Sequence, residues 1–204
     1  MIKSIIEKHY GYIPDYSNAY LDGRRFKIRT EETNLGNLIS DSMLWYAGQP
    51  TGENVQTALL NSGGIRTDIG ISKYLENSSR PVLQPSYAYK ESKILDGGIT
   101  DGHICATLTY DNGFVIFTVT ASELKDLLES GVADSAFGAT AGRFPQVAGI
   151  SFSFDTDKNP RSEFGDGERI QILEILSRNG GVQDTLVKDG NLIGDTERKF
   201  RLVT

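Results

Sequence analysis

Apolar and polar residues alternate with a period that changes along the first half of the chain. Residues 25–30 (RFKIRT) predict a short strand, and residues 34–47 then change to helical spacing, with apolar positions at Leu35, Leu38, Ile39 and Met43. Residues 55–60 (VQTALL) predict a buried strand that ends at the turn-forming run NSGG. Residues 70–99 show no strong period, and their Ser, Pro and Gly content predicts a long loop.

The second half of the chain carries clearer boundary signals. The tripeptide DNG at 111–113 stands between LTY and FVIFTVT and predicts a hairpin, because Asn-Gly tolerates positive φ. Thr120 and Glu123 form a T-x-x-E capping box, which predicts a helix through ELKDLLES that ends at Gly131.

The remaining segments read mainly as strands. Residues 150–154 (ISFSF) and 169–176 (RIQILEIL) predict a pair, Asp189-Gly190 predicts another hairpin, and 199–204 (KFRLVT) predicts a final strand. Strands outnumber helices, and the two clear helices are separated by strands. The pattern therefore predicts an α+β fold, a single domain of mixed or antiparallel sheet with helices packed on it.

Composition narrows the classes of function. The 204 residues, 38% hydrophobic and 24% charged, are enough for one good core. A net charge of -6 argues against a nucleic-acid polymer as partner, because such binding relies on clustered Lys and Arg. Residues 1–10 lack the apolar run of a signal peptide or membrane span. The two histidines, His9 and His103, have no metal-ligand spacing, and the one cysteine, Cys105, excludes an internal disulfide.

Two weaker chemical signals are outweighed by plainer interpretations. His103 and Cys105 would share one face of a strand, but no third group that could orient them is identifiable, so an inert cysteine is favoured over catalysis. The acidic stretch 155–166 overlays part of a calcium loop. It has Pro160 where that loop needs glycine and Asp166 at the twelfth position, so a solvated turn is favoured and calcium is the alternative.

Two polar segments could hold an anion. Asn61-Ser62-Gly63-Gly64-Ile65-Arg66 places two glycines and an arginine after a buried strand, where backbone N–H groups and a guanidinium can reach phosphate oxygens. An ordinary turn explains the same residues. The helix start at 29–38 also favours anions, although capping by Thr33 or Asn34, with Glu31 and Glu32 beside the helix dipole, explains it equally.

Three motifs in this order resemble the C-terminal domain of the 5′-nucleotidase family. They are ETNLGNLISDSM (32–43), LLNSGGIRTDI (59–69) and GRFPQVAGISFSFD (142–155). The resemblance covers residues 20–204 and leaves 1–19 as a linker or N-terminal extension. It implies a layered α/β/β/α domain that grips a nucleotide or related phosphate ester. The two divalent metals and the catalytic residues would belong to an N-terminal metallophosphatase domain of the same protein, which would be extracellular or periplasmic.

The resemblance assigns roles to individual residues. Asn61, Gly63, Gly64 and Arg66 match the family's substrate-facing loop, and Asn34 matches an asparagine at the helix start. Tyr110 stands where the family has a phenylalanine that stacks on the base; a half-buried strand aromatic is the alternative.

Two departures from the family weaken this assignment. Glu31 occupies a position where many members have a phosphate-binding arginine, with Arg29 as a substitute on the same face of a strand. The family's second aromatic wall and its Gly-Gly-Asp-Gly segment would follow Thr204, so the domain is expected to be incomplete there. The isolated chain is therefore expected to be inactive. The rival hypothesis is a non-catalytic binding or scaffold module of a larger surface protein.

Overall fold

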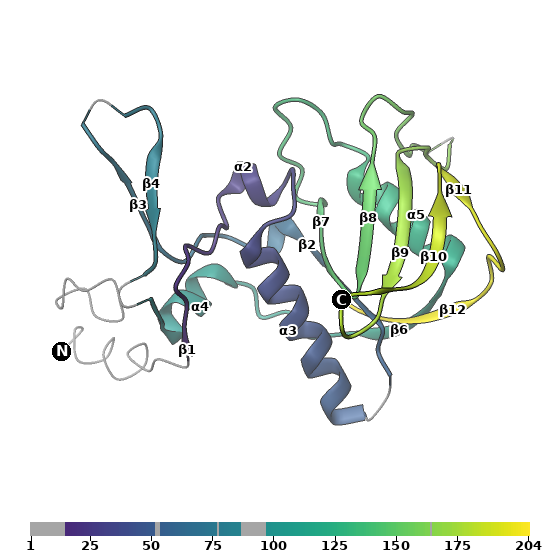
Figure 1. Ribbon diagram of the computed structural model, residues 1–204, viewed down its shortest axis with the longest axis horizontal. Helices are drawn as coiled ribbons and strands as arrows, with labels where there is room; N and C mark the ends of the chain where they lie inside the picture. The colour runs from purple at the N-terminus through teal and green to yellow at the C-terminus, as the bar shows by residue number, and fades with distance from the viewer. Residues whose placement is uncertain (1–14, 52–53, 77, 87–96, 164) are drawn as a thin grey trace.

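The computed structural model describes residues 15–51, 54–76, 78–86, 97–163 and 165–204 (Figure 1). The helices are α2 (Arg25–Ile28), α3 (Asn34–Thr51), α4 (Asp101–Thr107) and α5 (Ala121–Val132), with a 3-10 turn η1 (Ser62–Gly64). The strands are β1 (Asp15–Tyr16), β2 (Thr57–Asn61), β3 (Ile71–Tyr74), β4 (Pro81–Gln84), β5 (Gly98–Ile99), β6 (Ile116–Thr120), β7 (Pro145–Ala148), β8 (Ile150–Phe154), β9 (Ile170–Leu176), β10 (Val182–Lys188), β11 (Asn191–Leu192) and β12 (Lys199–Val203).

A mixed four-stranded sheet lies at the centre, in the order β6-β12-β2-β7. β12 and β2 run parallel, whereas the outer pairs are antiparallel. Helix α3 packs on one face of this sheet and buries an apolar stripe against it, made of Leu35, Ile39, Met43 and Ala47 together with Ala58, Ala148 and Val203 from the strands. Alternate residues of a strand point to opposite faces, so Leu59 and Val147 contribute to the core on the other side.

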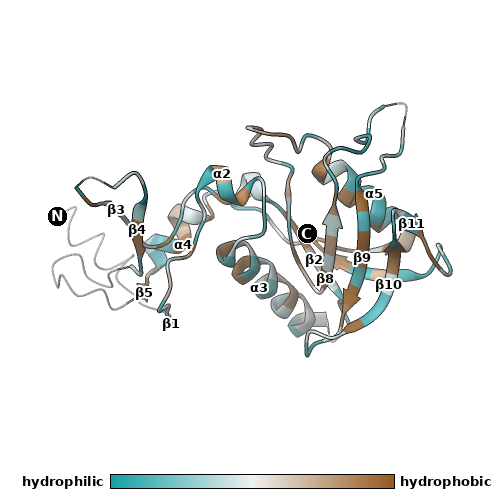
Figure 2. Ribbon diagram, turned by 45° about the horizontal axis from the view of Figure 1, so that its top comes forward, coloured by the Kyte–Doolittle hydropathy of each residue, from teal (hydrophilic) through white to brown (hydrophobic). Residues whose placement is uncertain are grey.

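The second sheet, β11-β10-β9-β8, is antiparallel and shares that other core. Strand β9 (IQILEIL) carries two polar residues among its apolar ones, and Figure 2 shows brown and teal bands along it. Helix α5 buries Leu124, Leu128 and Val132 in the same core. The predicted α+β fold is confirmed.

Most element predictions are confirmed, and for the reasons that the sequence supplied. Thr120 and Glu123 form the reciprocal capping box of α5, at 3.1 and 2.8 Å. β8 pairs with β9, and the hairpin from β10 to β11 turns at Asp189 and Gly190, which have φ of 50° and 79°. Helix α5 continues one residue past Gly131 before it ends.

Three predictions are wrong. Residues 25–28 form a helical turn, α2, because Ile28 is buried in the α3 core and its carbonyl is bonded by a distant side chain described below. Residues 71–84, expected as loop, form the β3–β4 hairpin that projects from the domain in Figure 1. The hairpin expected at 111–113 does not form, because α4 occupies the residues before it and 109–115 run irregularly into β6.

Helix α4 begins with a cap that histidine supplies. His103 Nδ1 accepts the Thr100 N–H, and Thr100 Oγ1 accepts the His103 N–H, both at 3.2 Å. Burial lowers the pKa of His103, against an opposing hydrogen bond with the Gly98 backbone. The unfolded chain therefore binds this proton at higher pH than the folded chain does, so the cap's contribution is present above about pH 6.5 and is lost as the pH falls below that value.

We expect His103→Gln to remove this pH dependence while it preserves the cap, because glutamine can also accept the N-cap N–H. Between neutral pH and pH values below about 6.5, the native chain should lose about 0.5–1 kcal/mol more of its unfolding free energy than the variant loses. Urea unfolding of both proteins across this range measures the difference. An equal pH dependence in the two proteins would show that His103 titrates without affecting the fold.

Candidate functional site

The site is built where η1 meets a second loop that precedes β7. The Ser62 N–H bonds to the Phe144 carbonyl at 2.8 Å, and the Gly63 N–H bonds to the Gly142 carbonyl at 2.7 Å. Asn61 Nδ2 also donates to the Gly142 carbonyl, at 3.3 Å. A Cβ on Gly63 would lie 3.0 Å from the Gly142 oxygen, so glycine permits this close approach. Asn61 and Gly63 therefore join the two loops, and Gly64 completes the turn that leads to Arg66.

Arg66 follows this turn in the chain, and its side chain packs against Tyr110. Its N–H bonds to the Thr107 carbonyl at 2.9 Å, which ties it to the end of α4, and its Nη1 donates to the Gly63 carbonyl at 3.1 Å. The guanidinium carbon lies 5.7 Å from the centroid of the Tyr110 ring, a cation–π contact. Tyr110 is 56% exposed and lies after α4, so the half-buried strand aromatic is excluded. The Tyr110 ring and the Arg66 side chain are both exposed.

Arg29 reaches the same place from the end of α2. Its Nη1 donates to the Thr140 carbonyl at 3.2 Å, whereas its Nε is buried without a hydrogen-bond partner. Burial lowers the pKa of Arg29, and the positive charges of Arg25 and Arg66 lower it further. Two guanidiniums, Arg29 and Arg66, are thus held near each other.

No ion pair within the described residues neutralises Arg29 or Arg66. The nearest acidic candidate by sequence, Glu31, is paired instead with Lys27 at 2.5 Å. Because α2 is helical, Arg29 and Glu31 do not share the strand face that the sequence predicted. A positive site without a carboxylate partner is the arrangement that attracts an anion, and each guanidinium can bind phosphate oxygens with two N–H groups.

The Asn34 side chain is held by two hydrogen bonds to backbone groups. Its Oδ1 accepts the Asp22 N–H and its Nδ2 donates to the Tyr20 carbonyl, both at 2.8 Å, so both ends of the amide are used by backbone. Thr33 Oγ1 accepts the Gly36 N–H at 3.1 Å and caps α3. Of the two explanations for this helix start, the geometry favours capping.

Gln146 is the residue that sequence reasoning missed. It is buried on β7, and its Nε2 donates to the carbonyls of Ile28 and Glu31, each at 2.9 Å. Gly36 leaves room for it, since a Cβ there would lie 1.9 Å from the glutamine oxygen. Gln146 therefore fixes the turn that carries Arg29. The available signal was its place inside the third motif, GRFPQVAGISFSFD.

The acidic loop and the cysteine carry no comparable arrangement. Asp155 Oδ1 accepts the Asp157 N–H, and Asn159 donates to Glu168, as in a hydrogen-bonded turn. Within the described residues, no three or more His, Cys, Asp or Glu side chains are grouped to hold a metal ion. Cys105 is exposed on α4, and His103 is used by the cap of that helix, so their predicted strand face does not exist.

The fold is an α+β domain, and the candidate site combines two guanidiniums, Arg29 and Arg66, with the exposed ring of Tyr110. The chain belongs to the family described as 5′-nucleotidase, C-terminal domain, which matches residues 12–203. It is 33% identical over 165 residues to the trifunctional nucleotide phosphoesterase protein YfkN of Bacillus subtilis, covering 81% of this chain and 9% of that protein. It is 29% identical over 186 residues to the 5′-nucleotidase of Bos taurus, covering 86% of this chain and 27% of that protein.

A solved structure agrees with this assignment. The crystal structure of the 5′-nucleotidase precursor from Thermus thermophilus superposes with a TM-score of 0.67 at 28% identity, covering 99% of this chain and 30% of that one. The chain thus spans from 9% to 30% of the length of these relatives, and the part it matches is their C-terminal domain.

Proposed function

We propose that this chain is the substrate-binding domain of a two-domain phosphoesterase and that it holds a nucleotide, or a related phosphate ester, by its phosphate and its base. The observation that supports this most is the pairing of Arg29 and Arg66 without an acidic partner beside the exposed ring of Tyr110. The guanidiniums bind the phosphate oxygens, and the tyrosine stacks on the base. The names of the relatives, nucleotide phosphoesterase and 5′-nucleotidase, fit this ligand.

In this proposal the chain contributes orientation and charge, and it contains no catalytic residue. An N-terminal metallophosphatase domain of the same protein holds two divalent metals that activate the attacking water, and residues 1–19 form a linker to it or an N-terminal extension. The protein is extracellular or periplasmic, as the snake venom 5′-nucleotidase of Crotalus adamanteus among the relatives suggests. Within the described residues, no helix combines the length and apolarity needed to cross a bilayer.

Calorimetric titration of the chain with AMP, UMP and adenosine tests the proposal. We expect at least one of the two nucleotides to bind at least about tenfold more tightly than adenosine, because a charge-assisted hydrogen bond contributes about 1.5–3 kcal/mol. With Mn²⁺ or Zn²⁺ added, neither nucleotide should release phosphate. If adenosine bound as tightly as both nucleotides, the proposed recognition of the phosphate would be wrong. If phosphate were released in a chelator-sensitive way, the chain would have a catalytic role.

The two arginines also bear on the rival hypothesis of a scaffold module. Two neighbouring arginines without an acidic partner repel each other, because like charges interact unfavourably at this range. A bound anion would compensate that repulsion. The geometry therefore favours ligand binding over a purely structural role.

A further inference from the structure

A hollow of about 520 Å³ lies between the N-terminal half of α3 and helix α4, which stand side by side in Figure 1. The buried part of its wall is entirely aliphatic and consists of Leu21, Leu35, Ile39, Ile69 and Ile99. Three further aliphatic side chains line it and remain 47%, 40% and 37% exposed, namely Leu38, Ile104 and Leu108. The hollow is therefore apolar, open to solvent, and within the size range of small-molecule pockets, about 300–1,000 Å³.

The wall of this hollow offers nothing to a charged ligand. None of the described residues that line it is charged. A bound anion or cation would lose its water there and find no opposite charge, which is costly. The hollow therefore favours neutral molecules, in contrast to the site at Arg29 and Arg66.

Most polar side chains in the wall are already used by the fold, and Thr107 is different. Ser17 and Ser42 donate their hydroxyls to backbone carbonyls, at 2.9 and 2.7 Å. Both ends of the Asn34 amide are bonded to backbone at 2.8 Å. Thr107, at the end of α4, is 1% exposed, and its Oγ1 is buried without a hydrogen-bond partner. The wall thus contains a hydroxyl whose hydrogen-bonding capacity is unsatisfied.

This accounting selects the class of ligand. A buried hydroxyl without a partner is unfavourable, and a ligand atom that bonds to it recovers that cost. The Thr107 hydroxyl donates as well as accepts, so either a hydroxyl or a carbonyl on the ligand satisfies it. Further polar groups placed against the aliphatic wall would lose water without replacing it. The ligand that fits is neutral and mainly apolar, with one hydrogen-bonding group.

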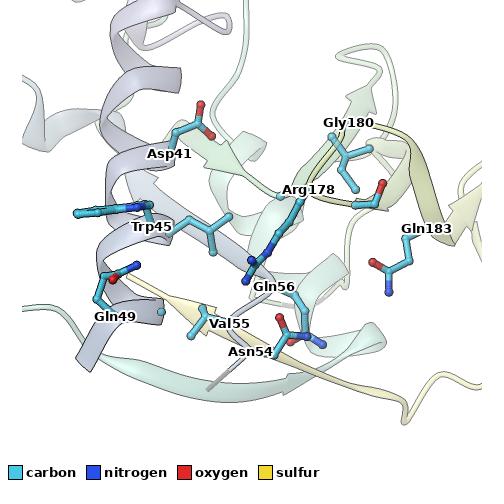
Figure 3. A pocket seen from close by; sticks show the side chains of 14 residues that line it. Asp41, Trp45, Gln49, Asn54, Val55, Gln56, Arg178, Gly180 and Gln183 are labelled. Carbon is cyan, nitrogen blue, oxygen red and sulfur yellow. The ribbon is translucent and has the colours of Figure 1, made fainter. Parts of the chain in front are cut away.

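The other end of α3 offers no comparable arrangement. A hollow of about 550 Å³ lies there, lined by polar side chains and by Trp45. Figure 3 shows the Trp45 ring directed away from Arg178, while Asp41 points elsewhere. Because these groups do not converge, they do not define one ligand.

We propose that the hollow between α3 and α4 binds a neutral, mainly apolar small molecule whose one hydroxyl or carbonyl group bonds to Thr107 Oγ1. The apolar part of the ligand lies against the aliphatic wall. This goes beyond nucleotide binding, because a nucleotide is an anion and the wall has no charged side chain among its described residues. The two sites meet at α4, since the Thr107 carbonyl accepts the Arg66 N–H at 2.9 Å.

Three probes that share an octyl or octanoyl chain and differ in the head group test the ligand class. They are 1-octanol, octanoate and octylammonium, each titrated at neutral pH into the isotope-labelled chain while backbone amide chemical shifts are followed by NMR. We expect 1-octanol to cause saturable shifts in α3 and α4, with a dissociation constant of about 1 mM or lower. Octanoate and octylammonium should bind at least about tenfold more weakly, because their charges find no partner in the hollow.

Two variants and a matched control test the residues. Thr107→Val keeps the shape of the side chain and removes the hydroxyl, so it should weaken 1-octanol binding at least about fivefold, as expected for one lost hydrogen bond. The same change should raise the urea midpoint of the free chain, because it removes an unsatisfied buried group. Leu38→Gln, at the rim, should also weaken binding at least about fivefold. Leu127→Gln changes an exposed leucine on α5, outside the hollow, and should bind 1-octanol as the native chain does.

The outcomes decide the proposal in both directions. It is overturned if 1-octanol causes no saturable shifts in α3 and α4, or if octanoate or octylammonium binds as tightly. It is also overturned if Thr107→Val, shown to be folded by circular dichroism, binds 1-octanol as tightly as the native chain. If sedimentation reveals a dimer that Leu38→Gln dissociates and Leu127→Gln preserves, a second copy of the chain covers the hollow, and the small-molecule proposal is wrong.

Discussion

Replacing Arg169 with methionine should lower the free energy of unfolding by about 3–5 kcal/mol, the cost of breaking a buried charged network. Arg169 is 7% exposed, and its guanidinium donates to five backbone carbonyls. Three of these lie at the C-terminal end of α5 or just after it, at 2.8–3.0 Å, and two lie in the loop before β9; the acceptors are Val132, Ala133, Ser135, Thr156 and Lys158. Methionine fills much of the volume but leaves these oxygens without donors.

The same network includes a buried acid. The carboxylate of Glu129, on α5, accepts the N–H groups of Arg169 and Ile170 at 3.1 and 2.9 Å. Arg169 and Glu129 therefore connect the end of α5 to the start of β9 from both sides. The Glu129 carboxylate keeps Lys125 as a cationic neighbour, at 3.9 Å, so the cost comes mainly from the carbonyls that lose their donors.

Arg143→Met provides the matched control for this prediction. Arg143 lies in the loop before β7, where it is exposed and pairs with the exposed Asp134 at 2.8 Å. An exposed ion pair contributes about 0–1 kcal/mol, so this variant should unfold near the native midpoint. Urea denaturation of both variants measures the difference. Equal losses in the two would mean that the carbonyls around Arg169 find water as a substitute.

The sequence predicted those elements whose signals are local. Helix α3 follows its apolar spacing at Leu35, Ile39 and Met43, although Leu38 is 47% exposed. Helix α5 follows its Thr120–Glu123 box, and the last hairpin follows Asp189-Gly190. The strand prediction is wrong at residues 25–28 because their alternation also suits a short helical turn, and the deciding contacts come from residues far away in the chain. Ile28 is buried in the α3 core, and Gln146, 118 residues later, bonds to its carbonyl.

In the candidate site, too, local signals could be read from the sequence and long-range contacts could not. Arg66 and Tyr110 could be proposed from motifs and lie together, 5.7 Å apart. The position of Arg29 depends on Gln146 and on the Thr140 carbonyl, so no local pattern could place it beside Arg66. Asn34 was proposed from its place at a helix start, where capping and ligand binding call for the same residue types. Only the bonds to Tyr20 and Asp22 distinguish the two.

Nucleotide binding should depend strongly on Arg66 if the proposed function is right. Arg66→Ala should weaken the affinity of the chain for its nucleotide about 10–100-fold, because it removes a charged donor and the partner of Tyr110. The affinity of Arg66→Lys should lie between those of the native chain and Arg66→Ala, since lysine keeps the charge but lacks the fork of N–H groups. In a cycle with Tyr110→Ala, the two losses should not add, because the side chains are in contact.

Arg24 supplies an internal comparison of the same kind. It too lies over a tyrosine, 5.9 Å from the Tyr20 ring, but an acid neutralises it, Asp22 at 2.6 Å. If unneutralised charge is what binds the phosphate, Arg24→Ala should leave the affinity unchanged while Arg66→Ala lowers it, and added salt should weaken binding in the native chain. Equal losses in the two alanine variants, measured by calorimetry, would mean that general surface charge holds the ligand, and the pairing of Arg29 with Arg66 would lose its role as the determinant of the site.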